Sequence, residues 1–178
     1  MLIVGDNLKY LMKQHDIIDN PNNFDQTSIA LGLGKTIIHM EPADNSKETI
    51  IYYGENIPED YYRTEQLNDR GINIPPKSCI LASSNETVKI PNGYFGLLQT
   101  KGSLARLFVS LTCTDGQVDP GYNGNITFEI CNHSNFYVNL KPKQLVGQLF
   151  LFKTSTKQIE LYNGKYQNAT GPTKHKSE

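Results

Sequence analysis

The sequence predicts a mainly β protein with one domain and a short helix near the N-terminus. From Ile74 onward, short apolar runs recur between turn signals such as Pro91-Asn92-Gly93 and Asp119-Pro120-Gly121. Residues 125–131 alternate strictly between apolar and other side chains, which is the pattern of a strand. The 178 residues fit a single domain, 1–178, with no internal repeat or linker. These features are typical of a sandwich, jelly roll or barrel.

The N-terminal third is expected to contain one helix and two strands. Residues 6–15 carry Leu8, Leu11, Met12 and His15 on one helical face, with Asp6 as the expected N-cap. Residues 28–34 and 50–53 are strand candidates, and residues 42–48 form a polar loop between them. Residues 54–71 are polar and charged, which fits either a solvated loop or a lid.

The remaining strands are expected where apolar runs lie between turn residues. These runs cover residues 79–82, 88–90, 95–98, 107–111, 125–131, 136–138, 145–152 and 159–162. The C-terminal residues 163–178 end in a polar stretch, which is expected to be mobile unless a ligand orders it.

Composition excludes several classes of function. The net charge is -1, so no overall field attracts the chain to nucleic acid or to a membrane, and neither is expected as a partner. The chain lacks both a signal-peptide pattern and an apolar run of membrane-spanning length. Three cysteines without a CxxC pair favour a reduced, cytoplasmic protein over a disulfide framework. The four histidines are scattered, so a zinc-activated water is not expected.

Residues 100–132 hold the side chains that best fit a functional site. Lys101 and Arg106 flank the small residues Gly102 and Ser103. Small residues let backbone N–H groups approach phosphate oxygens, and the cations add charge-assisted hydrogen bonds. The same residues would also be ordinary in a solvated surface turn.

Two acids further along this stretch are also open to two interpretations. Asp119 begins a turn at Pro120-Gly121, and next to Tyr122 it could hold a sugar while the ring packs against it. Glu129 alternates with apolar neighbours and faces either solvent or a cleft. In a cleft, partial burial would raise its pKa and suit it to act as a general base.

Several ordered segments resemble the dCTP deaminase branch of the dUTPase-like family. They are GSLAR, VDPGYNG, ITFEICN, GQLFLF and YNGKYQNATGPT, and the resemblance is dense from about residue 88 to 173. It implies a distorted jelly roll or β-barrel that forms a homotrimer with sites between subunits. It also implies a dCTP or dUTP ligand that carries Mg²⁺ on its triphosphate, without zinc.

The resemblance implies a role for each matching residue. Glu129 is the catalytic base, Arg106 belongs to the catalytic loop, and residues 163–178 close over the site. The implied substrate-binding residues are Lys101, Gly102, Ser103, Asp115, Asp119, Tyr122, Tyr162, Lys165 and Tyr166. The implied reaction is zinc-free hydrolysis of dCTP to dUTP and ammonia.

Four positions depart from the family pattern. Gly102 stands where a serine helps to hold the reacting water, and Asp115 where a small residue is usual. Gln117 and Ala169 occupy positions that are usually Arg and Gln. Two alternatives therefore stay open. One is dUTP pyrophosphatase activity, alone or in a bifunctional dCTP deaminase–dUTPase that forms dUMP. The other is a catalytically impaired nucleotide-binding or regulatory protein.

Overall fold

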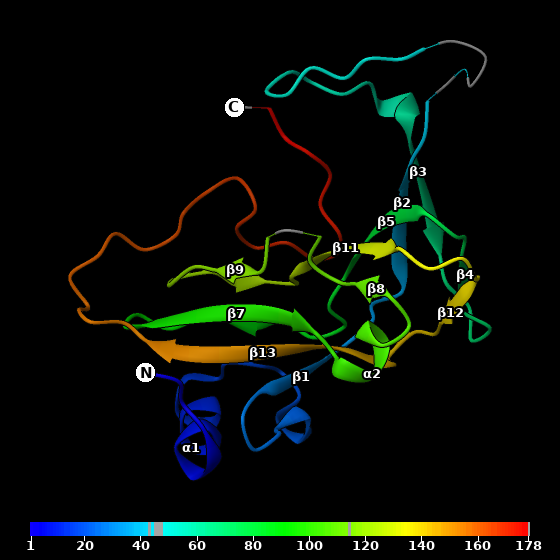
Figure 1. The fold of residues 1–178 in the computed structure, drawn as a ribbon. Helices are drawn as coiled ribbons and strands as arrows, with labels where there is room; N and C mark the ends of the chain where they lie inside the picture. Colours follow the sequence, from blue (N-terminus) through cyan, green and yellow to red (C-terminus); the bar gives the residue numbers. More distant parts are fainter. Residues whose placement is uncertain (43, 45–47, 114, 178) are drawn as a thin grey trace.

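The computed structural model describes residues 1–42, 44, 48–113 and 115–177. These residues form two α-helices, α1 (Gly5–His15) and α2 (Gly102–Ala105), two 3-10 turns, η1 (Pro21–Asn23) and η2 (Glu59–Tyr61), and short strands (Figure 1). The predicted mainly β fold with a short N-terminal helix is confirmed.

Two antiparallel sheets make up most of the fold. The four-stranded sheet has the order β1 (Ile29–Gly32), β13 (Leu145–Lys153), β7 (Tyr94–Thr100) and β9 (Gln117–Val118). The five-stranded sheet has the order β3 (Tyr62–Gln66), β2 (Thr36–Met40), β5 (Ser78–Ser83), β11 (Thr127–Asn132) and β8 (Val109–Ser110). Two smaller pairs are β10 (Asn123–Gly124) with β6 (Val88–Lys89), and β12 (Val138–Leu140) with β4 (Ile72–Ile74).

Apolar side chains of both sheets meet in one core. Phe128 and Ile130 of β11 and Leu149 and Leu151 of β13 are fully buried. Helix α1 adds Leu8, Leu11 and Met12 to this core, as its apolar spacing predicted. Burial of such side chains is the main source of stability in a domain of this size. The N-cap of α1 is Val4 rather than Asp6, and no side chain caps the helix.

A buried carboxylate joins three segments near the N-terminal half. Glu86 is 3% exposed and accepts hydrogen bonds from Asn23 Nδ2 at 2.9 Å and from the Gly32 backbone N–H at 2.8 Å. Asn23 Nδ2 also donates to the Ala30 carbonyl at 2.9 Å. A charged acceptor in a dry site needs such donors, so Glu86 fixes η1 against the end of β1.

The structure corrects several strand predictions. Residues 50–53 and 159–162 are not strands, and Ile50 and Tyr53 are 64% and 89% exposed. Apolar runs alone predicted strands there, but a strand also needs a partner edge. By contrast, residues 62–66, within the stretch expected to be a loop or lid, form β3, and the sequence reading missed β2 altogether. Of the expected loop at 42–48, residues 43 and 45–47 lie outside the described residues.

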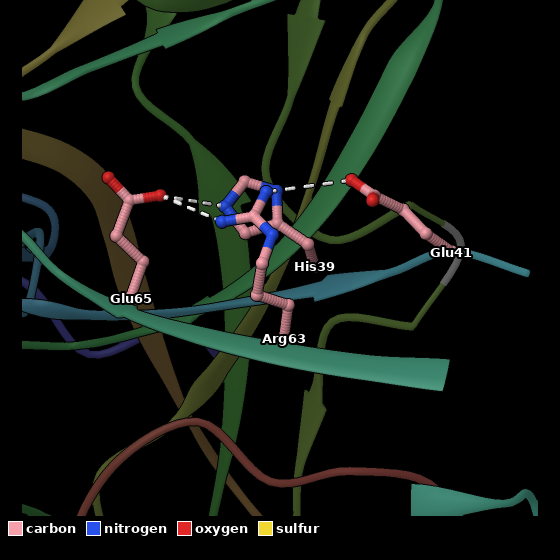
Figure 2. Close-up of polar contacts among 4 residues, drawn as sticks. All are labelled: His39, Glu41, Arg63 and Glu65. Carbon is pink, nitrogen blue, oxygen red and sulfur yellow. Dashed lines mark hydrogen bonds and ion pairs between the residues drawn. The ribbon is translucent and has the colours of Figure 1, made fainter. Parts of the chain in front are cut away.

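Polar side chains along one face of β2 and β3 hold these two strands together (Figure 2). His39 of β2 lies opposite Arg63 of β3, and its Nε2 is 3.1 Å from Glu65 Oε2. The Arg63 guanidinium contacts both Glu65, at 3.4 Å, and Glu41, at 3.6 Å. Because side chains alternate along a strand, this polar face leaves Met40 and Tyr62 on the opposite face of the sheet.

Candidate active site

Glu129 faces a cleft, which decides between the two interpretations of this residue. In β11, Phe128 and Ile130 are fully buried, whereas Glu129 points to the opposite face and is half-buried. It lies opposite Leu81 of β5, and both residues line a cleft of about 690 Å³. Alternation along β11 therefore places the Glu129 carboxyl group in a cleft that both apolar and polar side chains line.

The cleft changes the proton affinity of this carboxyl group. Burial raises the pKa of Glu129 to about 7, and the nearby Asp115 carboxylate adds to the increase. Asp115 lines the same cleft and accepts a hydrogen bond from the Gln117 backbone N–H at 3.1 Å. The Asp115 side chain therefore lies inside the site, although it is exposed to solvent there. A pKa near neutral lets Glu129 both accept and return a proton.

The predicted turn at residues 119–122 forms one wall of the cleft. Tyr122 N–H donates to the Asp119 carbonyl at 3.1 Å, and Gly121 has a φ of 93°. A Cβ at Gly121 would lie 2.8 Å from the Leu161 Cβ, so both the backbone conformation and the space require glycine. Asp119 and Tyr122, which the sequence predicted as a pair that holds a ligand, both line the cleft.

Tyr122 is fixed by its neighbours. Its hydroxyl donates to the Asn125 carbonyl at 2.6 Å, and its ring centroid is 5.9 Å from that of Tyr162. Burial, with a smaller contribution from Tyr162, raises the pKa of Tyr122 to about 12. The hydroxyl therefore stays protonated, and the ring presents a rigid apolar surface to the cleft.

The C-terminal segment lies along the cleft. Tyr162 and Tyr166 line it, and the Tyr166 backbone N–H donates to the Tyr162 hydroxyl at 3.2 Å. Gln167, which the sequence reading did not single out, donates to the carbonyls of Gly121 and Tyr162 at 2.9 and 3.1 Å. Lys165 does not line the cleft, and its ammonium group donates to the Lys176 carbonyl at 2.7 Å.

Several lining residues were not predicted from the sequence, and four of them carry functional or aromatic groups or come from unpredicted strands. Met40 and Tyr62 come from β2 and β3, and Lys174 and His175 come from the last residues of the chain. The only sequence signal for any of them was the pair of cations in the terminal stretch. No sequence signal placed Met40 and Tyr62 in the cleft, because their position depends on the pairing of β2 with β3, which the sequence did not reveal.

The predicted phosphate-binding residues lie apart from the cleft within one chain. The expected loop contains the one-turn helix α2. Arg106 follows it directly, and its Nη1 donates to the Gly102 carbonyl at 3.0 Å. Lys101, Gly102, Ser103 and Arg106 are absent from the lining of the cleft.

Exposed apolar side chains adjoin α2. Leu107, Phe108, Phe136 and Tyr137 are 53–77% exposed, and the His133 N–H donates to the Phe108 carbonyl at 2.9 Å. This hydrogen bond brings the segment after α2 next to the loop that carries Phe136 and Tyr137. An apolar surface of this kind is typical of a contact with another protein chain.

Two further properties concern metals and membranes. Within the part of the chain that the structure describes, no three His, Cys, Asp or Glu side chains converge as metal ligands. Over the same residues, none of the helices has the length and apolar character needed to cross a bilayer.

Comparison with known proteins identifies the family. The pattern of the dCTP deaminase-like family (DCD) matches residues 2–154. A dCTP deaminase, dUMP-forming, from Nanoarchaeum equitans is 33% identical over 189 residues, covering 97% of this chain and 96% of the relative. A protein of the same description from Corynebacterium kroppenstedtii is 40% identical over 109 residues, or 58% of each chain.

A solved structure has the same fold. The 2'-deoxycytidine 5'-triphosphate deaminase from Agrobacterium tumefaciens superposes with a TM-score of 0.64 over 86% of this chain, at 13% identity. The match spans 48% of that longer chain, and at this low identity it bears on the fold alone. The family pattern and the full-length relative together assign the sequence: this chain belongs to the dCTP deaminase-like family.

Proposed function

We propose that this protein converts dCTP to ammonia, dUMP and pyrophosphate, by hydrolytic deamination to dUTP followed by attack of a second water on the α-phosphate, which releases pyrophosphate. The observation that carries the proposal is Glu129, a half-buried carboxyl group with a pKa of about 7 in a cleft that also holds Asp119 and Tyr122. The sequence favoured dUTP as the end product. The dUMP-forming relative, which aligns over 97% of the chain, favours the bifunctional alternative instead.

The proposed chemistry uses Glu129 as base and then as acid. Its carboxylate takes a proton from water as the water oxygen attacks C4 of the cytosine ring. The protonated carboxyl group gives this proton to the ring nitrogen N3. It then takes the second proton from the added hydroxyl group and passes it to the amino group, which leaves as ammonia as the C4 carbonyl forms. A group with a pKa near the working pH performs both transfers efficiently, and a placed base typically contributes ~10²–10⁴-fold in rate.

The remaining cleft residues would orient the nucleotide. Asp119 would hydrogen-bond the deoxyribose, and the rigid Tyr122 ring would pack against the sugar. Tyr162 and Tyr166, with the rest of residues 163–178, would cover the ligand and exclude bulk water. Exclusion of water strengthens each polar contact inside the site.

The triphosphate would need more cations than the described residues of one cleft provide. Among the residues that the structure describes, the lining carries three carboxyl groups, from Asp115, Asp119 and Glu129, and one lysine, Lys174. A highly anionic ligand would be repelled by such a lining alone. We propose that a second copy of the chain supplies Lys101, Ser103 and Arg106 from its helix α2. The exposed apolar residues next to α2 support a trimer with sites between subunits.

Mg²⁺ would accompany the ligand rather than occupy a protein cage. Mg²⁺ prefers oxygen ligands and usually combines phosphate oxygens, waters and one or two carboxylates. Asp115 and Asp119 are carboxylates of this kind in the cleft, so the residues present fit an ion that is held mainly by the triphosphate. When bound, the ion supplies positive charge beside the phosphates. All three cysteines are free thiols, in keeping with the proposed cytoplasmic location.

Two departures from the family pattern favour a second candidate function. Asp115 lies in the cleft and adds negative charge beside Glu129, and Gly102 removes a hydroxyl group from the proposed phosphate helix. Both departures would slow a deaminase, so a nucleotide-binding protein with little turnover is the alternative.

Product analysis separates these functions. The purified protein would be incubated with dCTP and Mg²⁺, and separately with dUTP and Mg²⁺, with ammonia, pyrophosphate and nucleotides measured. Ammonia with dUMP and pyrophosphate from dCTP supports the proposal. Ammonia with dUTP alone would limit the activity to deamination. Pyrophosphate from dUTP without ammonia from dCTP would indicate a dUTPase. Binding of either nucleotide without turnover over hours would favour the regulatory alternative.

A further inference from the structure

Tyr62 carries a hydroxyl group that has no partner within the described part of the chain. Tyr62 opens β3 and lines the cleft, and its hydroxyl oxygen is shielded from solvent without a hydrogen bond. A buried hydroxyl group without a partner costs about 1–3 kcal/mol, and nearly all such groups in native proteins are satisfied. An orphaned donor that faces a ligand cleft therefore points to the ligand as its missing partner.

Strand register places Tyr62 on the same face of the sheet as Glu129. Tyr62 pairs with Met40, two residues beyond Ile38 on the same face of β2. Ile38 pairs with Leu81 of β5, and Leu81 pairs with Glu129 of β11. Three strand spacings of ~4.8 Å separate the two strands, or about 14 Å. An extended nucleoside triphosphate is long enough to reach from one side chain toward the other.

The polar contacts on the opposite face fix this register. His39, Arg63, Glu41 and Glu65 interact across β2 and β3 (Figure 2). Alternation along the strands places them on the face opposite Met40 and Tyr62. A shift of one residue would break these contacts and would turn Tyr62 out of the cleft. The position of Tyr62 is thus specified by its strand rather than by a loose loop.

A cation lies beside the Tyr62 ring. Lys174 Nζ is 4.8 Å from the ring centroid, and the same ammonium group pairs with Glu59 of η2. Burial raises the pKa of Tyr62, so the phenol stays protonated and its hydroxyl group can donate a hydrogen bond. The His175 backbone lies close enough to oppose this increase in part, but the contact lacks hydrogen-bond geometry.

The chain closes over this end of the cleft. Residues 48–61 project beyond the sheets, and the C-terminal end of the chain runs beside them (Figure 1). The rings of Tyr53 and His175 are 6.1 Å apart, and Ser177 Oγ donates to Asn56 Oδ1 at 2.9 Å. These contacts join the residues that follow Lys174 to residues 53–56, next to the Lys174–Glu59 ion pair.

We propose that Tyr62 is a ligand-contacting residue whose hydroxyl group donates a hydrogen bond to a phosphate oxygen of the bound nucleotide. The neighbouring Lys174 ammonium group favours an anionic acceptor over a base or sugar oxygen. The contact is distant from Glu129, so it serves binding rather than proton transfer. This inference rests on the proposed nucleotide substrate and adds a phosphate contact from the cleft's own chain.

The matched pair Tyr62→Phe and Tyr61→Phe tests this contact. Tyr61 precedes Tyr62 directly but does not line the cleft. Binding of the non-hydrolysable analogue α,β-imido-dUTP with Mg²⁺ would be measured by calorimetry, and binding of deoxyuridine by competition. A hydrogen bond to a charged group corresponds to a roughly 10- to 100-fold loss of affinity. Tyr62→Phe is expected to lower the affinity for the analogue by that factor and to leave the affinity for deoxyuridine unchanged. Tyr61→Phe is expected to change neither affinity.

Two further readouts exclude a merely structural effect. Without ligand, Tyr62→Phe is expected to unfold at the same temperature as the wild type or slightly above it, because it removes an unsatisfied buried group. In turnover, it is expected to raise KM for dCTP and to leave kcat nearly unchanged.

The outcomes that overturn the inference are distinct from failure of the proposed function. A wild-type protein that turns over dCTP, together with unchanged analogue binding by Tyr62→Phe, overturns the Tyr62 contact alone. The contact is also overturned if Tyr62→Phe and Tyr61→Phe lose the same affinity for the analogue. The same holds if Tyr62→Phe loses equal affinity for the analogue and for deoxyuridine. A wild-type protein that neither binds nor turns over dCTP, dUTP or the analogue overturns both proposals.

Discussion

Asp115 and Glu129 face the same cleft, and the Asp115 carboxylate adds to burial in raising the pKa of Glu129 to about 7. The two acids come from different parts of the fold, since Glu129 lies in β11 and Asp115 precedes β9. The isolated bridge between Thr112 and Glu129 brings the two segments together. A carboxyl group poised near neutral pH is thus a consequence of tertiary structure.

The pH profile of deamination should report this pair. Glu129 must be ionised to act as base, so kcat is expected to rise with pH through about 7. Asp115→Asn removes a neighbouring negative charge and should move this rise to lower pH. Initial rates between pH 5 and 9 would measure both curves, with the exposed, distant Asp69→Asn as the control. An unchanged curve in Asp115→Asn would contradict the coupling.

Stability should depend on pH through the same group. The pKa of Glu129 is raised from 4.5 to about 7, so the folded state holds this proton more tightly than the unfolded state. Over that window the unfolded state binds fewer protons, and the free energy of unfolding falls as pH rises. Glu129→Gln removes this contribution to the pH dependence of the free energy of unfolding. Its Tm relative to the wild type should therefore increase between pH 5 and pH 8 in thermal unfolding without ligand. A constant Tm difference would count against the raised pKa.

Mixed oligomers should reveal which chain supplies each side of the site. Arg106→Ala and Glu129→Gln are each expected to be nearly inactive alone. If α2 of one copy completes the cleft of another, refolding the two variants together in equal amounts restores intact sites. Random assembly gives about a quarter of the wild-type activity, because each site needs one intact residue from each of two neighbours. No recovery of activity would mean that both residues serve a site from the same chain.

Glu86 should be important for stability and not for the chemistry. Replacement by Ala leaves the Gly32 N–H and one N–H of the Asn23 amide buried without an acceptor. The expected loss is about 3 kcal/mol in the free energy of unfolding, measured by urea denaturation. The exposed Glu160→Ala serves as the control and should stay within about 0.5 kcal/mol of the wild type. A loss for Glu86→Ala as small as that for the control would refute this role.

Gly102→Ser should speed deamination if the missing hydroxyl group limits the reaction. A Cβ at Gly102 would lie 3.3 Å from Arg106 Nη1, the flexible end of a side chain that can move slightly. A hydroxyl group aimed at the reacting water is worth ~10²-fold or more in kcat. The matched control is Ala105→Ser, an exposed position on the same helix. Equal kcat values for Gly102→Ser and the wild type would show that the substitution is neutral.

Local pattern in the sequence determined the helix, most of the central strands and the alternation along β11. Hydrophobic periodicity reflects burial, and β11 must bury Phe128 and Ile130 whatever lies on its other face. The hydrophobic pattern gave wrong predictions where strand pairing decides whether a segment is a strand. The apolar residues 50–53 have no strand partner, whereas the polar residues 62–66 pair with β2 and form β3.

The sequence by itself thus determined the family, the mainly β fold and the presence of Glu129, Asp119 and Tyr122 near one another along the chain. Only the tertiary structure decided that Glu129 faces a cleft, that Asp115 shares it, and that Tyr62 enters it from three strands away. It also separated α2 from the cleft of its own chain. The physical reason is that strand register and the meeting of distant segments depend on long-range contacts, which leave no periodic signal in the residues that make them.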